Sequence, residues 1–506
     1  MILETFKDAG KKLSTPQITS YFNADNIILL LRPGETEWKT RQIIRVSLNT
    51  INALLRGVTK ARVSYSNEYR LNYIPVLLVN SFQYDEVWNL AAAAVPFVSA
   101  LCRALGGLYG DAASKADSDL ATILRKPFFV TELLQRTEND SARHMRIRHV
   151  SAWINDMRDL CYTMLSLSSN LSDSFFTANP HFITEEVFYN IDKISLGNLK
   201  SIGDKLISTL VIRCAASLPQ NLDSFLTPIL GVFLHQATMR LGNAWQNHSD
   251  NLQKRSSQED LSEEMGLQEE LRIFTRGMSK LLYSFSLEIS LQRIFERSKP
   301  RGIRSDRKEQ FRINKILINY LFKSQKVCEP LLTLLSFFLR CPDSIARNNV
   351  HRFLLQATRI MCDQREYLET FAKLMVEAIK VQSEIREVDD NLIDFICLLI
   401  RLLRKTRRQL PQEVIAAGVP SIPSEDVDFL LNAFASKDTV LHRKKTKQFL
   451  LKLSGEEGIE LYFERSGMHV NSVRRRTKRG GIAREKTTSF VDPVNLGLLF
   501  EGADSL

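Results

Sequence analysis

Histidine and cysteine are the residue types of this chain best suited to metal binding and nucleophilic chemistry, and neither type is clustered. Eight histidines are scattered, and His144 and His149 are five residues apart, whereas two ligands on one helix face are separated by four. No HExxH motif and no CxxC pair occurs. We therefore expect no metal centre and no cofactor.

The seven cysteines lie in or beside apolar runs with a helical spacing. They are Cys102, Cys161, Cys214, Cys328, Cys341, Cys362 and Cys397. This arrangement is typical of reduced thiols in the core of an intracellular protein rather than of a disulfide framework.

Motifs for catalysis and for nucleotide binding are also missing from the sequence. It contains no GxxxxGK(S/T), GxGxxG or GxSxG motif, and the glycines of residues 106–110 are better explained by a turn. The acidic pairs Glu185–Glu186 and Asp389–Asp390 fall where helices are expected to begin. Helix-dipole stabilisation explains such pairs better than acid–base catalysis does. We predict that the protein is not an enzyme.

Basic residues offer the chemistry that the sequence favours, which is contact with phosphate. The net charge is +11, and two basic groups fall in stretches without a helical period. The candidate phosphate contacts are Arg297, Lys299, Arg301, Arg304, Arg307 and Lys308 in an expected loop, and Arg474, Arg475, Arg476, Lys478 and Arg479 in an expected tail. Such groups bind the backbone of a nucleic acid without reading its sequence. A solvated basic surface, or a nuclear localisation signal in the tail, would explain the same residues.

Two further basic groups are expected on helices. Arg404, Lys405, Arg407 and Arg408 end one helix, and Arg443, Lys444, Lys445 and Lys447 open another. Cations are favourable at a helix C-terminus, so the first of these groups needs no ligand to explain it.

The elements that must position these residues are helices. Between Leu226 and Gln246, a stripe at three- and four-residue spacing consists of Leu230, Phe233, Leu234, Ala237, Leu241 and Trp245. Thr227 is expected to cap this helix and Pro228 to occupy its first position, where a missing N–H costs nothing. Strand-like alternation is nearly absent, and the segment 72–82 is better explained as a helix that begins at Pro75.

Later helices follow one another in pairs. The predicted helices are 326–340, 343–361 with Asp343 as its cap, 367–383 and 391–405. Successive pairs begin about 40 residues apart, which is typical of HEAT repeats, and neighbouring pairs must stack to bury their apolar faces. We predict an all-α, HEAT-repeat-like (armadillo-like) α-solenoid of antiparallel helix pairs over residues 1–465, clearest from about residue 142. A basic, disordered C-terminal tail is predicted over residues 466–506.

Loops are expected where the sequence is polar or rich in proline and small residues, at 136–144, 246–264, 297–309 and 408–426. The N-terminal residues show no signal-peptide pattern, and no apolar run is long enough to cross a bilayer. We therefore expect a soluble protein inside the cell, without membrane insertion.

The segment from Leu226 to Gln246, LTPILGVFLHQATMRLGNAWQ, resembles a characteristic segment of exportin-5-type receptors, which are karyopherin-β nuclear export receptors. The matching residues are Pro228, Ile229, Leu230, Gly231, Met239, Arg240, Leu241, Trp245 and Gln246. Residues 268–282 (QEELRIFTRGMSKLL), 443–453 (RKKTKQFLLKL) and 496–502 (LGLLFEG) are similar to later segments of that family. The resemblance covers the C-terminal half of the family's chain, and the N-terminal repeats that supply most of the Ran contact have no counterpart here.

The resemblance implies a non-enzymatic exportin that shuttles between nucleus and cytoplasm through the nuclear pore. Its solenoid would wrap a protein cargo or a structured, double-stranded RNA cargo in a complex with Ran-GTP, and it would contact nuclear pore proteins. Ran-GTP is expected as a partner of the full-length receptor, since the N-terminal Ran-binding repeats are absent. The alternative is a HEAT-repeat scaffold without Ran coupling.

Overall fold

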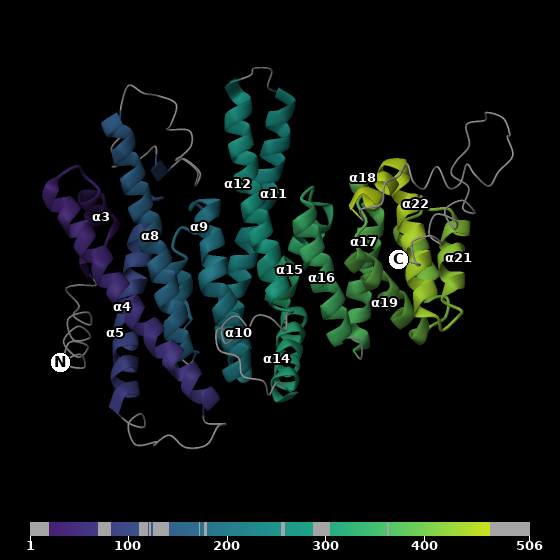
Figure 1. Ribbon diagram of the computed structural model, residues 1–506, viewed down its shortest axis with the longest axis horizontal. Helices are drawn as coiled ribbons and strands as arrows, with labels where there is room; N and C mark the ends of the chain where they lie inside the picture. The colour runs from purple at the N-terminus through teal and green to yellow at the C-terminus, as the bar shows by residue number, and fades with distance from the viewer. Residues whose placement is uncertain are drawn as a thin grey trace. The chain divides into compact units, whose positions relative to one another are not determined.

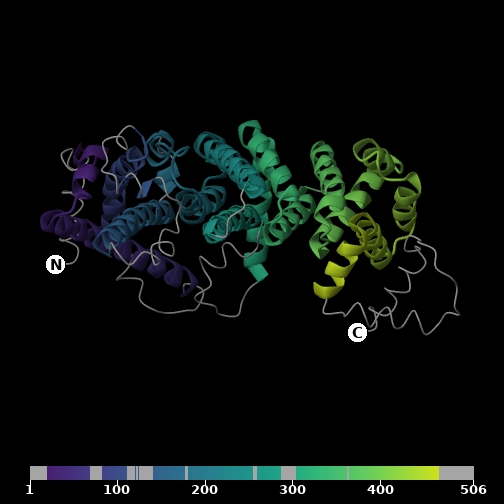
Figure 2. The same ribbon diagram turned by 90° about the horizontal axis from the view of Figure 1, so that it is seen from above.

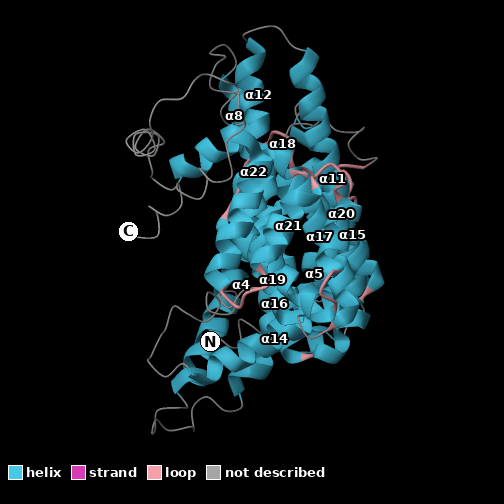
Figure 3. Cartoon of the chain, turned by 90° about the vertical axis from the view of Figure 1, so that its right-hand side faces the viewer, coloured by secondary structure: helices cyan, strands magenta, loops and turns pink. Residues whose placement is uncertain are grey.

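The computed structural model describes residues 20–68, 82–110, 120, 123–124, 141–171, 173–176, 180–254, 259–286, 304–361 and 364–465. Figure 3 shows that the regular elements among these residues are helices, with no strand. The predicted all-α class of packed helices is therefore confirmed. None of the helices in the described ranges has both the length and the apolar character needed to cross a membrane.

The chain divides into two compact units, Met1–Phe337 and Phe338–Leu506. The first contains α3 (Ala24–Leu30), α4 (Glu35–Glu68), α5 (Phe82–Gly107), α8 (Ser141–Leu171), α9 (Leu196–Ser201), α10 (Ser208–Ser217), α11 (Thr227–Lys254), α12 (Glu259–Ser284) and α14 (Arg304–Lys323). Short 3-10 or π-helical segments lie between them: η4 (Asp173–Phe176), η5 (Phe182–Val187), η6 (Ile202–Ile207), η7 (Pro219–Asn221) and η8 (Leu222–Leu226).

The second unit contains α16 (Ser344–Met361), η9 (Arg365–Tyr367), α17 (Leu368–Lys380), α18 (Gln382–Ile385), α19 (Asp390–Thr406), α20 (Leu410–Gly418), α21 (Ser424–Ala433) and α22 (Thr439–Arg465). The boundary between the units lies within α15 (Gln325–Arg340). The predicted tail, residues 466–506, lies outside the described residues, so the division of the chain at residue 465 stays a prediction.

Helix α8 is central to the N-terminal part of the first unit. It packs against α4, α5 and α10 (Figure 1). Its buried stripe consists of Val150, Ile154, Met157, Cys161 and Leu165. Burial of one large apolar side chain contributes roughly 1.5–3 kcal/mol, so this stripe is a major source of the packing energy. The loop predicted at 136–144 is wrong from Ser141 onward, where α8 begins, and its earlier residues lie outside the described residues.

Helix α11 is the one predicted between Leu226 and Gln246, and its apolar stripe is buried as predicted. The stripe residues from Leu230 to Leu241 are inaccessible to solvent. Trp245 is only half-buried, and its Nε1–H donates to Thr275 Oγ1 at 3.1 Å.

The predicted cap at Thr227 is wrong. Thr227 has helical φ and ψ angles, because α11 continues directly from the π-helical segment η8. Its hydroxyl instead forms hydrogen bonds with Tyr320 Oη (3.0 Å) and Ser324 Oγ (3.2 Å). A proline inside a regular α-helix clashes with the carbonyl four residues earlier, and the wider π-helical turn before Pro228 relieves this clash.

The segment that carries the family resemblance makes contacts between helices. Arg240 donates from its two Nη atoms to the carbonyls of Asp192 (2.6 Å) and Ile194 (2.7 Å). A Cβ atom added at Gly231 would lie 3.1 Å from the carbonyl oxygen of Lys326, so α15 approaches α11 closely at this glycine. These residues therefore serve packing in the first unit.

Helices α11 and α12 form a long hairpin, which Figure 1 shows extending beyond the neighbouring helices of the first unit. The loop predicted at 246–264 is therefore wrong, since 246–254 belong to α11 and 259–264 to α12. The first stretch contains glutamine and lysine and the second contains three glutamates, and all of these residue types have high helix propensity. A helix end that extends beyond its neighbours needs no apolar stripe, so polarity alone does not identify a loop.

The boundaries of α16, α17 and α19 lie within three residues of the predicted ones. The Asp343 carboxylate accepts a hydrogen bond from the backbone N–H of Ala346 (2.9 Å) and caps α16 as predicted. Asp389 caps α19 in the same way. Helix α16 packs against α19, which also contacts α17 and α22; the green and yellow helices of Figure 2 show this neighbourhood.

Two other predictions of local structure need correction. The break predicted at 408–426 contains α20, with Pro411 in its first turn, where a missing N–H costs nothing. It also contains the first residues of α21. Glu186 lies near the end of η5 rather than at a helix start, and it forms an ion pair with Arg103 at 2.7 Å. The helix predicted at 72–82 lies outside the described residues except for Phe82, which opens α5.

Gly106 closes α5 where the turn was predicted, and replacing it with alanine is expected to lower the free energy of unfolding by about 1–3 kcal/mol. An added Cβ atom would lie 2.4 Å from the carbonyl oxygen of Tyr189. That backbone is held in place because Asn190, with φ of 55°, donates from Nδ2 to the Gly106 carbonyl at 3.1 Å. Urea unfolding followed by circular dichroism measures the loss.

Gly242 in α11 provides the matched control, because no atom lies within 4 Å of an added Cβ atom there. Since glycine is a poor helix former, Gly242→Ala is expected to raise the free energy of unfolding by about 0.5–1 kcal/mol. Equal stability of the Gly106→Ala variant and the unchanged protein would contradict the close approach of residues 189–190 to α5.

Candidate cargo-binding surfaces

Most of the predicted phosphate contacts lie where the structure gives no side-chain description. Arg297, Lys299 and Arg301 fall outside the described residues, as do Arg474, Arg475, Arg476, Lys478 and Arg479. Arg304, Arg307 and Lys308 lie on the first two turns of α14, whose side chains are described only from Phe311 onward.

The loop predicted at 297–309 is therefore wrong from Arg304 onward. Its last six residues, RSDRKE, include arginine, lysine and glutamate, which favour a helix. Because Arg304, Arg307 and Lys308 have the spacing i, i+3 and i+4, the helix places them on one face. Their role as phosphate contacts stays a prediction.

The basic group at the end of α19 is partly occupied by contacts within the protein. Arg404 Nη1 donates to the carbonyl of Leu431 in α21 at 2.7 Å, and Arg407 forms an ion pair with Glu413. Burial, with a smaller contribution from Arg408, lowers the pKa of Arg404. Lys405 and Arg408 are exposed and have no ion-pair partner in the described part of the chain.

The basic group at the start of α22 lies against the same helix α21. The Lys445 ammonium lies 4.0 Å from the centre of the Phe429 ring, while Arg443 forms ion pairs with Asp390 and Asp394, each at 2.9 Å. Burial, and then Lys444, lowers the pKa of Lys445. Tertiary packing thus brings two basic groups that are distant in sequence, one on α19 and one on α22, into contact with α21.

We call the exposed or half-exposed basic residues at these two contacts, and those next to them in sequence, the α21 basic surface; they are Arg404, Lys405, Arg408, Lys444 and Lys445. Acidic residues interrupt this surface, since Glu425 and Asp428 are exposed on α21 itself and Asp426 pairs with Lys452. Its field is therefore mixed, and it is weaker than the positive charge of the two groups suggests.

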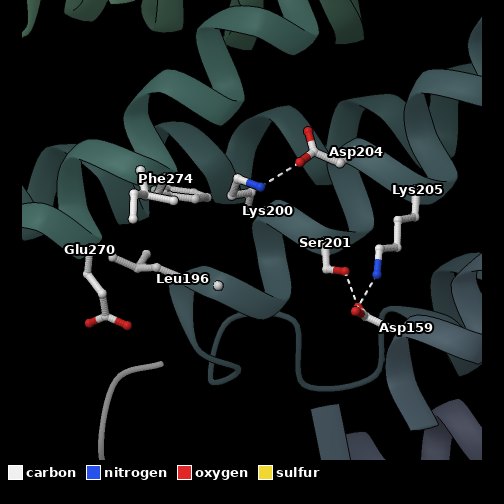
Figure 4. A pocket seen from close by; sticks show the side chains of 10 residues that line it. Asp159, Leu196, Lys200, Ser201, Asp204, Lys205, Glu270 and Phe274 are labelled. Atoms are coloured by element: carbon white, nitrogen blue, oxygen red, sulfur yellow. Dashed lines mark hydrogen bonds and ion pairs between the residues drawn. The ribbon is translucent and has the colours of Figure 1, made fainter. Parts of the chain in front are cut away.

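A cavity of about 250 Å³ lies beside α9 in the first unit, and several charged side chains line it (Figure 4). Asp159 of α8 accepts hydrogen bonds from the Ser201 hydroxyl and the Lys205 ammonium. Lys200 pairs with Asp204 at 2.6 Å, one turn away on the same helical segment. Each lysine is thus neutralised by a carboxylate, and the cavity has no free positive charge for an anion.

The remaining walls of this cavity come from Leu196 and from the α12 residues Glu270, Ile273 and Phe274. Gly277 of α12 makes room for the Lys200 stem, since an added Cβ atom would lie 2.9 Å from it. No histidine lines the cavity beside Ser201, so it lacks the Ser–His arrangement of nucleophilic catalysis. The network joins α8, α9, η6 and α12 and serves packing.

Sequence reasoning missed this cavity. The Lys200–Asp204 pair at i, i+4 is visible in the sequence, but Asp159 and Glu270 come from other helices that no local pattern connects to it.

Burial holds the thiols of Cys214, Cys341 and Cys397 in their neutral form. Burial raises the pKa of Cys214 to about 12, and burial also dominates the rise to about 11 at Cys341 and Cys397. All described cysteines are free, and Cys362 lies outside the described residues. Within the described ranges, no group of three or more His, Cys, Asp or Glu side chains is placed to hold a metal ion.

Stacked helices that present charged surfaces are typical of helical-repeat binding proteins. The Exportin-5 family model matches residues 108–462, and the chain therefore belongs to the Exportin-5 family. No curated protein and no solved structure matches the chain. The family is one of karyopherin-type nuclear export receptors, which are transport proteins rather than enzymes.

Proposed function

We propose that this chain acts in a nuclear export receptor that carries protein or structured, double-stranded RNA cargo to the cytoplasm in a Ran-GTP-dependent complex. The observation that carries the proposal is the family match over residues 108–462, which includes nearly all the described helices from α8 to α22. The receptor would contact nuclear pore proteins and shuttle between nucleus and cytoplasm.

Contact with RNA would use the predicted phosphate contacts at residues 297–308 and 474–479. The deep, narrow groove of an RNA duplex hides the bases, so a protein recognises the duplex by its shape and backbone. The α21 basic surface would add a smaller contribution, because its acidic neighbours reduce the local positive field.

Coupling between cargo and Ran-GTP is the property that separates an exportin from a scaffold. By linkage, cargo must tighten Ran-GTP binding by the same factor by which Ran-GTP tightens cargo binding, commonly about 5- to 150-fold. We expect a pull-down of cargo by the full-length receptor to depend on Ran bound to GTP and not on Ran bound to GDP. The same assay on this chain alone shows whether these 506 residues are sufficient to bind Ran-GTP.

Retention of cargo that is equal with GTP-bound Ran, with GDP-bound Ran and without Ran would contradict the proposal. It would favour a HEAT-repeat scaffold that joins proteins without Ran coupling. Binding of Ran-GTP by the full-length receptor or by this chain, together with a matching increase in cargo affinity, would support the exportin proposal.

A further inference from the structure

A second cavity, of about 430 Å³, lies between α4 and α8 in the first unit, outside the surfaces described above. Its volume is within the range of small-molecule sites. Three arginines, a histidine, a glutamine and two tryptophans line it together with a single alanine, and no carboxylate is among the lining residues. The lining is therefore positive and aromatic. We call it the Trp38 pocket.

The floor of the Trp38 pocket is fixed by hydrogen bonds. Trp153 is only 3% exposed, and its Nε1–H donates to the backbone carbonyl of Arg41 at 3.1 Å. The Arg41 guanidinium in turn donates to the carbonyls of Leu30 and Arg32, at the C-terminal end of α3. An aromatic ring and a buried cation thus form a rigid base under the cavity.

The rim of the pocket is exposed and has unused binding capacity. Trp38 is 48% exposed, although a large aromatic ring of this kind is normally covered. Arg148 and His149 are exposed on α8 and have no hydrogen-bond or ion-pair partner in the described part of the chain. Arg45 is already paired with Asp156 at 2.7 Å, so Arg148 is the cation most available to a ligand.

A ligand that uses all of these groups must carry both an anionic group and a flat ring. The Arg148 fork matches the geometry of a phosphate, which can accept two parallel N–H bonds. The Trp38 ring offers a stacking face of the kind on which unpaired bases lie in single-strand-binding proteins. Gln42 also lines the pocket, and its amide can both donate and accept hydrogen bonds, as contact with a base edge requires.

We propose that the Trp38 pocket binds a nucleotide, with its base stacked on Trp38 and its phosphate held by Arg148 and His149. This site differs from the duplex contact proposed above, because a paired base cannot reach Trp38. It requires neither Ran nor export activity. The ligand is either a free nucleotide or one unpaired nucleotide of an RNA strand, which present the same phosphate and ring.

Sequence reasoning passed over these residues, although a signal was present. Trp38, Arg41, Gln42 and Arg45 have the spacing i, i+3, i+4 and i+7, which places them on one face of α4. A helix face that combines tryptophan, arginine and glutamine is poorly suited to core packing. The partner residues Arg148 and His149 come from a helix about a hundred positions later, which no local pattern indicates.

The test is fluorescence anisotropy of the full chain with a labelled, short single-stranded oligoribonucleotide. Trp38→Ala is expected to weaken binding about 5- to 150-fold, because one base loses its stacking partner. Trp38→Phe is expected to retain most of the affinity. Ile43→Ala is the matched control, since Ile43 is 65% exposed on the same helix and does not line the pocket; its affinity should not change.

A second arm tests the phosphate contact. Arg148→Gln is expected to lower the slope of log affinity against log salt by about 0.7. Lys39→Gln should leave the slope unchanged, because Lys39 is paired with Glu35 on α4 and does not line the pocket. Competition by a mononucleotide identifies a free nucleotide as the ligand, whereas competition by the oligonucleotide alone identifies a strand.

Three results would overturn the proposal. One is unchanged affinity of the correctly folded Trp38→Ala variant, as judged by its circular dichroism. Another is binding of duplex RNA together with no binding of single strands or mononucleotides. The third is preference for a phosphotyrosine peptide over every nucleotide, which would make the pocket a phosphopeptide site.

Discussion

Asp389→Ala is expected to lower the free energy of unfolding of the second compact unit by about 2–4 kcal/mol, the combined cost of a lost helix cap and of a buried polar group left without its partner. The carboxylate accepts hydrogen bonds from the backbone N–H groups of Asn391 (2.9 Å) and Leu392 (3.0 Å), and its other oxygen contacts His351 Nδ1. The Asp389 side chain is 24% exposed and that of His351 only 4%. Alanine removes the cap of α19 and leaves a buried imidazole without its partner.

The same contacts predict how acid acts on this unit. Burial raises the pKa of Asp389, but His351 and the two backbone donors lower it by more, so the pKa lies below its usual value. The stabilisation is therefore complete above the unfolded-state pKa of about 3.9, and it is lost as pH falls through the lower native pKa. Asp389→Asn should reduce this acid-dependent loss.

Hydrogen exchange of the α19 amides, measured against pH, checks both expectations. Asp390→Asn is the matched control, because Asp390 is a neighbouring carboxylate whose side chain is 64% exposed and pairs with Arg443 at the surface. An exposed pair of this kind contributes about 0–1 kcal/mol. If the two variants lose the same protection, the His351–Asp389 contact does not stabilise the unit.

The affinity for duplex RNA is expected to fall about 10³- to 10⁵-fold between about 50 and 200 mM salt if six to ten of the predicted phosphate contacts are used. Each phosphate that a cation neutralises releases counterions and contributes about 0.9 to the slope of log affinity against log salt. Replacing Arg474, Arg475, Arg476, Lys478 and Arg479 with glutamine should therefore lower that slope by about 4 to 5. Filter binding across a salt series measures the slope for the unchanged protein and the slope for the variant.

Glutamine at Lys39 and Lys373 provides the control for this series. Both lysines are exposed and already paired with a glutamate four residues earlier, so the slope should stay the same. A second variant neutralises the six basic residues between Arg297 and Lys308. An RNA complex that is insensitive to salt, or a slope unchanged by both variants, would remove phosphate contact from the proposed mechanism.

The amino-acid sequence by itself determined the helices that have a buried stripe and a side-chain cap. Helices α16 and α19 begin where Asp343 and Asp389 predicted, because a carboxylate satisfies free N–H groups by purely local geometry. The apolar stripe of α11 was likewise readable, since its period follows from 3.6 residues per turn. The family resemblance of the same segment agrees with the match over residues 108–462.

Polar composition misled the prediction where tertiary packing decides. Residues 246–254 and 259–264 extend a hairpin, and 410–418 form α20, although each stretch was expected to be a loop. Helix propensity differs by only a few tenths of a kcal/mol between most residues, so support from the neighbouring turns and helices outweighs it. The predicted cap at Thr227 is wrong because the π-helical segment η8 precedes it and the helix continues through this residue.

Only the tertiary structure decided which charged and aromatic residues meet. Arg404 on α19 and Lys445 on α22 both contact α21, and Trp38 on α4 and Arg148 on α8 line one pocket. A helical period shows which face of a helix is buried but not which other helix covers it. Partner choice depends on how apolar faces throughout a unit pack at once, and this information lies in the folded chain rather than in any local stretch of sequence.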